Sequence, residues 1–211
     1  MVYKFVFFCD MLSLDEEGKQ GDLMSYQRRR FFNTNDIVDS LNTLDYLCIK
    51  NGVVAELVKL GGAGILINME AEGQEFRSTQ DIDVNIVSTN DFDKMYEILR
   101  EANIHVVGGV MEVPPMEDMM ETGAKFELKS NFQAIKVYVP SIELLACAKI
   151  FSTREKDLED LRNTDILDKC NIPKLLQLVD EYKDYVLNPS NMNMNLHELD
   201  NILKKKGYNK E

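Results

Sequence analysis

The chain has 211 residues with an apolar fraction of 45%, which is enough for one domain with a hydrophobic core or for such a domain with a helical extension. Its 36 acidic and 24 basic residues give a net charge of -12, and this charge argues against broad binding of nucleic acid, duplex DNA included. Four widely spaced cysteines exclude a zinc ribbon and a disulfide framework, and no apolar run is long enough to span a membrane, so we expect a cytoplasmic protein.

The first part of the chain alternates strands and helices. Asn35 or Asp36 can cap a helix whose apolar residues recur at helical spacing, and Asn51-Gly52 can end it. In chain order the patterns predict a strand at 1–9, a polar connection at 10–25, this helix, a strand at 53–60 that runs into a glycine pair, and a short buried helix at 65–69.

The rest of the chain changes from strands to helices. After a polar connection at 70–76, the patterns predict a strand with two aspartates, a helix at 91–103, a strand at 104–107, a loop or lid at 108–122 and a hairpin of 125–128 with 134–139. Helices are then predicted at 142–151, 155–169, 173–187 and 196–206. An asparagine-rich run at 188–195 precedes the last of them. Because strands come first and helices last, we expect an α+β fold with a core over residues 1–140 and a helical region over residues 141–211.

Two motifs on neighbouring elements indicate chemistry. Asp81 and Asp83 alternate with apolar residues on a strand, so their side chains share a face, and a divalent cation would compensate their repulsion. Gly61-Gly62 stands where a strand turns into a helix, and without Cβ atoms its amides can approach a phosphate. Alone, the glycine pair fits a tight turn without a ligand better than a phosphate site, and the aspartate pair fits a solvated strand edge equally well. Together they predict a site for a magnesium-bound nucleoside triphosphate.

The same motifs carry a resemblance that covers about residues 54–168. Leu60-Gly61-Gly62 is followed by Arg77-Ser78-Thr79-Gln80-Asp81-Ile82-Asp83, and a later helix carries Lys149, after which come Arg154, Lys156 and Asp157. This order resembles the nucleotidyltransferase superfamily with the polymerase-beta-type core, and within it the AbiEii-like toxins and related nucleotidyltransferase-like bacterial proteins. The resemblance implies a mixed sheet flanked by helices.

The resemblance also implies roles for individual residues. The implied catalytic residues are Asp81, Asp83, Glu127 and Lys149, of which Asp81, Asp83 and Glu127 would bind Mg²⁺. The implied nucleotide-binding residues are Gly61, Gly62, Arg77 and Thr79. Other interpretations stay open: Glu127 as an exposed strand residue, Arg77 as a structural ion pair, and Lys149 in a charge network with Arg154, Lys156, Asp157 and Asp160. His105 and His197 have no matching partners and are expected to be incidental.

The expected activity is transfer of a nucleoside monophosphate from an NTP to an acceptor hydroxyl. By resemblance the acceptor is a tRNA or a protein, in a toxin-antitoxin or phage-defence setting with a cognate antitoxin as partner. The negative net charge favours a small basic protein over RNA. Two alternatives remain: a non-catalytic binding protein that keeps the fold, and a nucleotidyltransferase for a small aminoglycoside-like molecule.

Overall fold

The computed structural model describes residues 30–107, 113–186, 188 and 190–208 of the chain. The strand predicted at 1–9, the connection at 10–25 and part of the loop predicted at 108–122 lie outside these residues. The described residues form two parts, a sheet part within residues 30–140 and a helical part within residues 141–208. The sheet part contains α1 (Thr34–Asn51), β1 (Ala55–Leu60), α2 (Gly61–Ala71), β2 (Asp83–Thr89), α3 (Phe92–Glu101), β3 (His105–Val106), α4 (Met116–Met119), β4 (Lys125–Glu127) and β5 (Ile135–Pro140).

The helical part follows β5 directly. Its first predicted helix is confirmed within a residue, whereas the stretch predicted at 155–169 is two helices, because the backbone of Thr164 is extended. The asparagine-rich run leads into a short 3-10 helix. The elements are α5 (Ile142–Ile150), α6 (Glu155–Asn163), α7 (Ile166–Lys169), α8 (Ile172–Tyr182), η1 (Lys183–Tyr185), η2 (Asn195–Glu198) and α9 (Leu199–Lys205).

Local sequence explains the helix ends nearest the N-terminus. The side chain of Asn33, rather than Asn35 or Asp36, caps α1 by accepting a hydrogen bond from the amide of Asp36 at 2.9 Å. Gly52 ends the helix with a φ of 67°, a left-handed conformation that glycine adopts without steric cost. The helix after β1 begins at the glycine pair itself, four residues before the predicted start at residue 65.

The five strands form one mixed sheet in the order β3-β2-β1-β5-β4, which confirms the expected fold class. β1 is antiparallel to β2 and parallel to β5. The last residue of β1, Leu60, pairs with the first residue of β2, Asp83. Because β5 runs parallel to β1, the chain leaves the sheet at Pro140 on the same end, and the helical part starts there.

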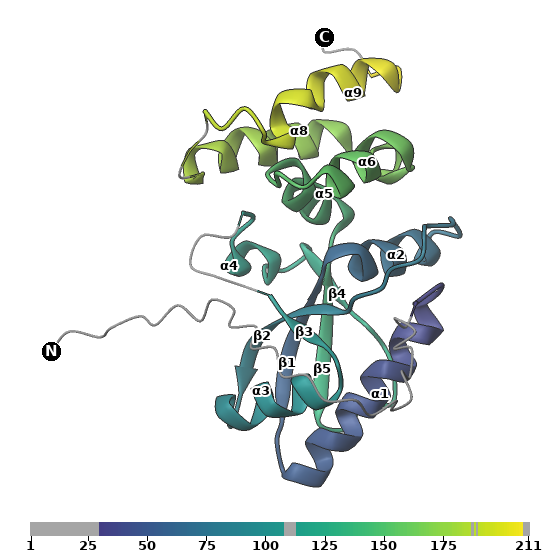
Figure 1. Cartoon of the computed structure of the whole chain (residues 1–211), viewed down its shortest axis with the longest axis vertical. Coiled ribbons are helices and arrows are strands. Elements are labelled where there is room, and N and C mark those ends of the chain that lie inside the picture. The colour runs from purple at the N-terminus through teal and green to yellow at the C-terminus, as the bar shows by residue number, and fades with distance from the viewer. Residues whose placement is uncertain (1–29, 108–112, 187, 189, 209–211) are drawn as a thin grey trace, which may run out of the picture.

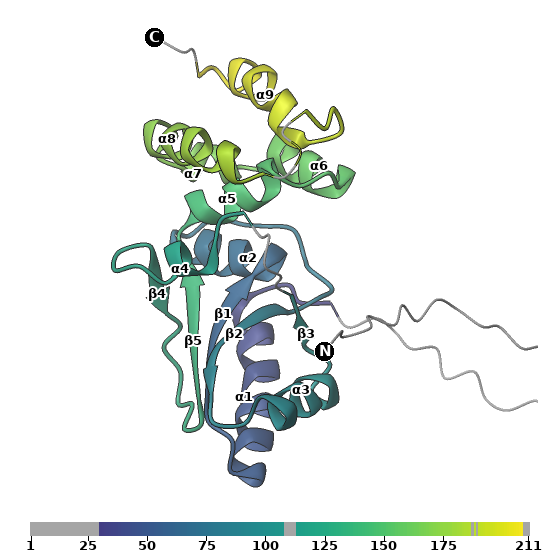
Figure 2. The ribbon, with the colours of Figure 1, turned by 90° about the vertical axis from the view of Figure 1, so that its left-hand side faces the viewer.

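One face of the sheet packs on α1 and α3. Leu57 of β1 and Val84 of β2 lie in one buried cluster with Leu44 of α1 and Ile98 of α3. Figure 2 shows both helices on the same side of the sheet, with the helical part above its end. Packing on this face accounts for the buried residues that alternate along β2.

A second buried cluster joins the sheet part to the helical part. It brings Leu60 of β1 and Ile65 of α2 against Leu145 of α5 and Leu175 of α8. In Figure 1 the helical part accordingly sits on the end of the sheet that carries α2. None of the helices that the structure describes is both long and apolar enough to cross a membrane.

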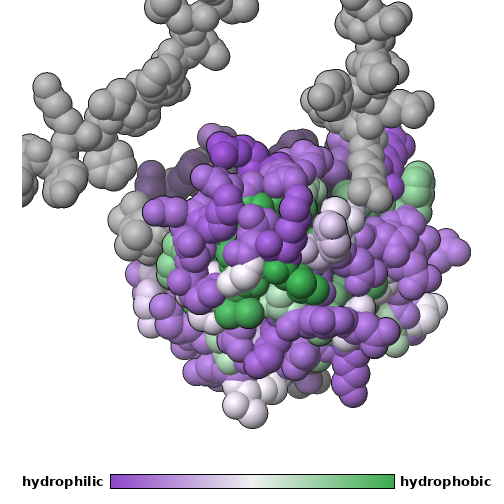
Figure 3. Space-filling model, turned by 90° about the horizontal axis from the view of Figure 1, so that it is seen from below, coloured by the Kyte–Doolittle hydropathy of each residue, from purple (hydrophilic) through white to green (hydrophobic). Residues whose placement is uncertain are grey.

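The opposite end of the strands is more open. Figure 3 views the molecule from below, where hydrophilic side chains cover most of the surface and hydrophobic ones gather near the centre. A cavity of ≈520 Å³ lies where β1 and β5 begin, lined among others by Val54, Glu127 and Ile135. This cavity is remote from the end of β1 that carries the glycine pair.

Candidate functional site

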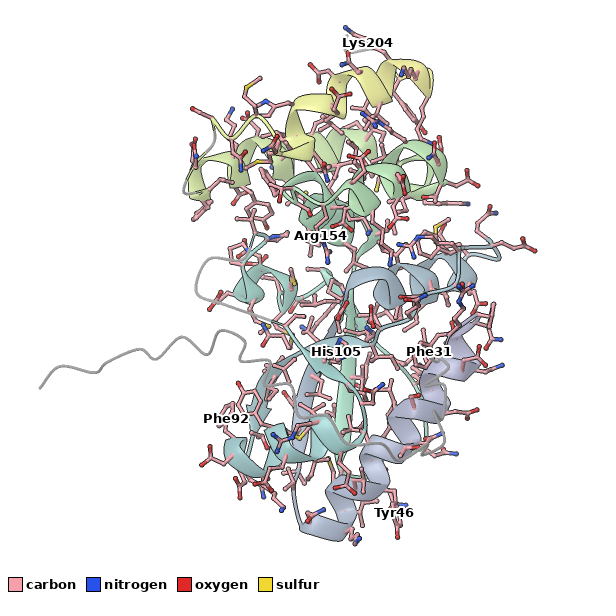
Figure 4. All side chains as sticks on the ribbon, viewed as in Figure 1. Phe31, Tyr46, Phe92, His105, Arg154 and Lys204 are labelled. Carbon is pink, nitrogen blue, oxygen red and sulfur yellow. The ribbon has the colours of Figure 1, made fainter. Side chains whose placement is uncertain are left out.

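A cleft of ≈360 Å³ lies between the end of the sheet and the helical part. Leu60, Gly61 and Asp83 of the sheet part form the floor of the cleft, and α5 and the residues that follow it form the roof. Figure 4 shows Arg154 at this junction, on the side of the helical part that faces the sheet. The lining residues are Leu60, Gly61, Asp83, Val107, Val113, Pro114, Met119, Leu145, Ala148, Lys149, Ser152, Arg154 and Asp157.

The floor brings the first glycine and the second aspartate of the two motifs into contact. Gly61 has a φ of +62°, and a Cβ atom placed on it would lie 2.4 Å from Oδ2 of Asp83. A side chain at this position would therefore collide with the carboxylate, and its backbone would be strained. Glycine is required here because β2 places Asp83 directly against the turn from β1 into α2.

The second glycine, Gly62, lies next to Arg77 and Thr79, which precede the two aspartates in the sequence. A Cβ atom on Gly62 would lie 3.1 Å from Oγ1 of Thr79 and 3.8 Å from Nη2 of Arg77. Thr79 is buried, and its amide and carbonyl pair with Phe31 in an isolated bridge beside the sheet. The structure thus gathers Gly61, Gly62, Arg77, Thr79 and Asp83 around the N-terminus of α2.

Asp81 lies just outside the strand that the sequence predicts for it. β2 begins at Asp83, and Asp81 is exposed two residues before it, where its carbonyl accepts a hydrogen bond from Oγ1 of Thr79 at 3.4 Å. Its carboxylate is near enough to act on the charge of the buried Lys59, as that of Asp83 is. Both carboxylates therefore belong to the entrance of β2.

The roof is organised around Lys149, which is only 5% exposed. Its Nζ donates to Oδ1 of Asp157 at 2.6 Å and to Oδ2 of Asp160 at 2.7 Å. Arg154 donates from Nε to Oδ2 of Asp157 at 2.6 Å, while its side chain stays 74% exposed over the cleft. Lys156, which the sequence placed in the same network, is exposed.

Arg77 extends this network into the sheet part. Its Nε and Nη2 donate to the two carboxylate oxygens of Asp160, and its Nη1 donates to the carbonyl of Ser78 at 3.2 Å. The guanidinium is a bidentate link between the glycine turn and α6. Three cations, Arg77, Lys149 and Arg154, thus surround two carboxylates, so this network carries one excess positive charge, which Asp83 on the floor of the cleft balances.

The two carboxyl groups of the roof are held ionised by these cations. Burial alone would raise the pKa of Asp160, but hydrogen bonds from Arg77 and Lys149 outweigh it and hold the pKa below its ordinary value. Burial alone would also raise the pKa of Asp157. Lys149, Ser152 and Arg154 outweigh this effect, so the pKa of Asp157 is lowered as well. Both carboxyl groups are therefore ionised at neutral pH.

Three residues of the site carry no signal that the sequence motifs could reveal. Asn195, buried within the asparagine-rich run, donates from Nδ2 to the carbonyls of Lys149 at 2.9 Å and Arg154 at 3.4 Å, and so holds the roof in place. His105 of β3, for which the sequence suggests no partner, places Nδ1 4.0 Å from Oδ1 of Asp83. Lys59 of β1 lies beneath the floor.

Lys59 is fully buried although it is a lysine. Its Nζ donates to the carbonyls of Leu60 at 2.9 Å and Asp83 at 2.8 Å. Burial lowers the pKa of this amine to about 7, and the carboxylates of Asp83 and Asp81 oppose the shift. The sequence hid this residue, because a lysine inside an apolar strand is most often one that points to solvent.

Glu127, the expected third metal ligand, does not join the aspartates. It lies on β4, opposite Tyr138 of β5, and β5 and β1 both intervene before β2. Three strand spacings separate β4 from β2, which is about 14 Å. Glu127 is exposed and lines the cavity at the other end of the strands. Among the described residues, no group of three or more His, Cys, Asp or Glu side chains is arranged to hold a metal ion.

A family of known proteins matches most of the chain. The model of a family described as a nucleotidyltransferase of unknown function (DUF6036) matches residues 38–206, which include the floor and the roof of the cleft. None of the curated proteins and none of the solved structures matches the chain. Since the family match covers most of the sequence, the chain belongs to this family of nucleotidyltransferases of unknown function.

Proposed function

We propose that the chain transfers a nucleoside monophosphate from an NTP to an acceptor hydroxyl, with Mg²⁺ bound by Asp81 and Asp83. The observation that carries this proposal is the contact between Asp83 and Gly61 inside the cleft. It sets a carboxylate beside the N-terminus of α2, where backbone amides attract phosphate. A carboxylate and a phosphate at one point are compatible when a cation lies between them.

The donor set at the entrance of β2 fits magnesium. Mg²⁺ is commonly bound in proteins by one or two carboxylates together with substrate phosphates, and keeps several waters. Asp81 supplies an exposed carboxylate and Asp83 supplies a half-buried one that lines the cleft, so a third protein ligand is not required. When bound, Mg²⁺ neutralises the phosphate charge that grows in the transfer.

The remaining residues position the nucleotide. The amides of Gly61 and Gly62 would hold the β- and γ-phosphates. On the roof, the exposed guanidinium of Arg154 would offset the negative charge of the phosphates. The acceptor oxygen forms a bond to the α-phosphorus, the bond to the bridging oxygen of the β-phosphate breaks, and pyrophosphate leaves. The hydroxyl proton passes to a base or to water. Arg77 and Lys149 are bound to carboxylates, so their part is to hold the roof over the floor.

The cleft has space for the rest of a nucleotide. A second cavity of ≈290 Å³ shares Val113, Ala148 and Ser152 with it, so the two adjoin. Phe151 and Asn191 also line this second cavity. A nucleoside attached to phosphates at Gly61 can therefore continue away from the floor without crossing the sheet.

The acceptor is the open part of the proposal. By resemblance to AbiEii-like proteins it is a tRNA or a protein within a toxin-antitoxin or phage-defence pair. The net charge of -12 favours a basic protein, and an aminoglycoside-like polycation would be attracted in the same way. We propose a cytoplasmic protein acceptor as the first to test.

The position of Glu127 supports a second candidate function. Because it lies three strands from Asp83, the site has two carboxylates where the superfamily usually has three. A protein of this fold that binds a magnesium-nucleotide without transferring it fits two carboxylates equally well. Such a protein would act through a partner that senses the bound nucleotide.

One experiment separates these candidates. Each of the four NTPs, labelled at the α-phosphate, is incubated with the chain, Mg²⁺, and either total RNA or cell lysate as acceptor. We expect label on one class of acceptor with the wild type and none with the Asp81→Ala/Asp83→Ala variant. Binding of an NTP by calorimetry without any transfer would select the non-catalytic candidate. If neither binding nor transfer occurs, both candidates fail.

A further inference from the structure

The feature that the proposed mechanism leaves unused is Lys59. Its side chain is fully buried in β1, immediately before the floor of the cleft, and no part of it lines the cleft. Burial of an ammonium group is costly unless hydrogen bonds and nearby charge compensate it. A lysine buried at this position is therefore expected to make a polar interaction that an apolar residue could not make.

Lys59 makes two such interactions, both of them hydrogen bonds to backbone carbonyls. Nζ donates to the carbonyl of Leu60, which belongs to the peptide bond leading into Gly61, and to the carbonyl of Asp83. These are the last residue of β1 and the first of β2, which pair with each other at the end of the ladder. Lys59 thus fastens the backbone on both sides of the contact between Gly61 and Asp83.

That contact tolerates little movement. The Cα of Gly61 lies so close to Asp83 that an added Cβ would be 2.4 Å from Oδ2. A metal-binding carboxylate must be held to a fraction of an ångström, and groups that fix ligands from behind normally matter nearly as much as the ligands. Without Lys59, the carbonyls of Leu60 and Asp83 would lose the hydrogen bonds that Nζ donates, and the entrance of β2 would be free to shift.

We propose that Lys59 is a positioning residue that holds Asp83 in its cation-binding place by fastening the entrance of β2 to the end of β1. This inference rests on the proposed function, because it takes Asp83 as a ligand of the metal. It adds a residue that the motifs do not include and that touches neither metal nor nucleotide.

The charge of Lys59 and its two hydrogen bonds have opposite effects on cation binding, so replacing Lys59 can separate them. In its protonated form Lys59 lies close to Asp81 and Asp83 and repels a cation, so removing that charge alone would tighten cation binding. Removing the two hydrogen bonds would loosen Asp83 and weaken cation binding. The sign of the change therefore shows which effect dominates, and a purely structural role for Lys59 predicts no weakening.

The test measures Mn²⁺ binding, with and without inorganic tripolyphosphate, by paramagnetic resonance and calorimetry. Lys59→Met removes the charge and both donors, and we expect Mn²⁺ affinity to fall about tenfold. Lys59→Gln also removes the charge but keeps an N–H donor, so we expect it to recover most of that loss. Ile98→Ala, in the core beneath the sheet, serves as a control for lowered stability and should bind Mn²⁺ like the wild type.

Each outcome has a distinct meaning. Unchanged or tighter Mn²⁺ binding by Lys59→Met overturns the positioning role and leaves the proposed function standing. If the methionine variant does not fold by circular dichroism, the glutamine variant decides by the same sign, since it is equally neutral. If the wild type itself binds no Mn²⁺ in the presence of tripolyphosphate, the proposed metal site falls, and the inference falls with it.

Discussion

The floor and the roof of the cleft are held together in different ways. The floor depends on the register of two adjacent strands: Leu60 faces Asp83, and the glycine after Leu60 leaves room for the carboxylate. The roof depends on ion pairs between distant residues, with Lys149 bound to Asp157 and Asp160. Strand register is a backbone property, whereas ion pairs depend on the charge of each partner.

This contrast indicates how the two sides should respond to change. Substitutions in the floor should affect ligand binding more than folding, because the carboxylates there are exposed or half-exposed. Substitutions in the roof should affect folding first, because its charges are buried and compensate one another. The following experiments test that division.

The largest effect on stability is expected at Lys149. Replacing it by methionine leaves the carboxylates of Asp157 and Asp160 buried with fewer cations, and removal of one partner from a buried ion pair costs about 3–5 kcal/mol. Urea unfolding measures the change in the free energy of unfolding. Lys156→Met, an exposed lysine of the neighbouring helix, is the matched control and should change stability by less than about 0.5 kcal/mol.

A loss below about 1 kcal/mol for Lys149→Met would contradict the division, since surface ion pairs contribute that little. In that case the roof would be held by apolar packing of α5 against α8. Arg77→Met should produce a smaller loss than Lys149→Met, because its side chain is 31% exposed and water can replace part of the interaction.

How far the sequence predicts each side follows from the same contrast. The floor was predictable because its signals are local: a glycine pair at a strand end and two aspartates at the start of the next strand. The α+β fold was equally predictable from the order of strands and helices. Glu127 was misplaced because sequence order says nothing of β5 inserting between β1 and β4.

The roof was only partly predictable for a physical reason. The charged residues from Lys149 to Asp160 are close in sequence and lie on two consecutive helices, α5 and α6, so a network among them can be predicted. Asn195 is more than forty positions away from Lys149, and a run of asparagines resembles a linker. Lys59 was hidden because burial of a lysine depends on the backbone carbonyls that happen to converge on it.

An intermediate effect is expected in the floor, from Gly61→Ala. The left-handed backbone and the carboxylate at 2.4 Å both oppose a side chain, and such strain costs about 1–3 kcal/mol. Gly62→Ala is the matched control, because its backbone is not left-handed and its nearest neighbour, Oγ1 of Thr79, lies 3.1 Å away. Urea unfolding and Mn²⁺ titration should both show a larger change for Gly61→Ala. Equal changes at the two glycines would show that Asp83 moves away freely.

The smallest effect concerns acid and belongs to the roof. The pKa values of Asp157 and Asp160 are held below the ordinary value by Lys149 and the arginines, so the unfolded chain takes up protons there before the folded one does. The stability that these carboxylates provide is complete above about pH 5 and is lost as the pH falls below about 4 toward their folded pKa values.

Urea unfolding between pH 6 and pH 3 measures this loss, which is at most about 1.4 kcal/mol per pH unit for each carboxyl group. Asp160→Asn should flatten the dependence, because one of the two groups no longer titrates. Glu159→Gln, an exposed neighbour on α6, should leave the dependence as in the wild type. Should Asp160→Asn keep the full acid dependence, the ion pairs of the roof would not govern stability, and the contrast between roof and floor would have to rest on packing alone.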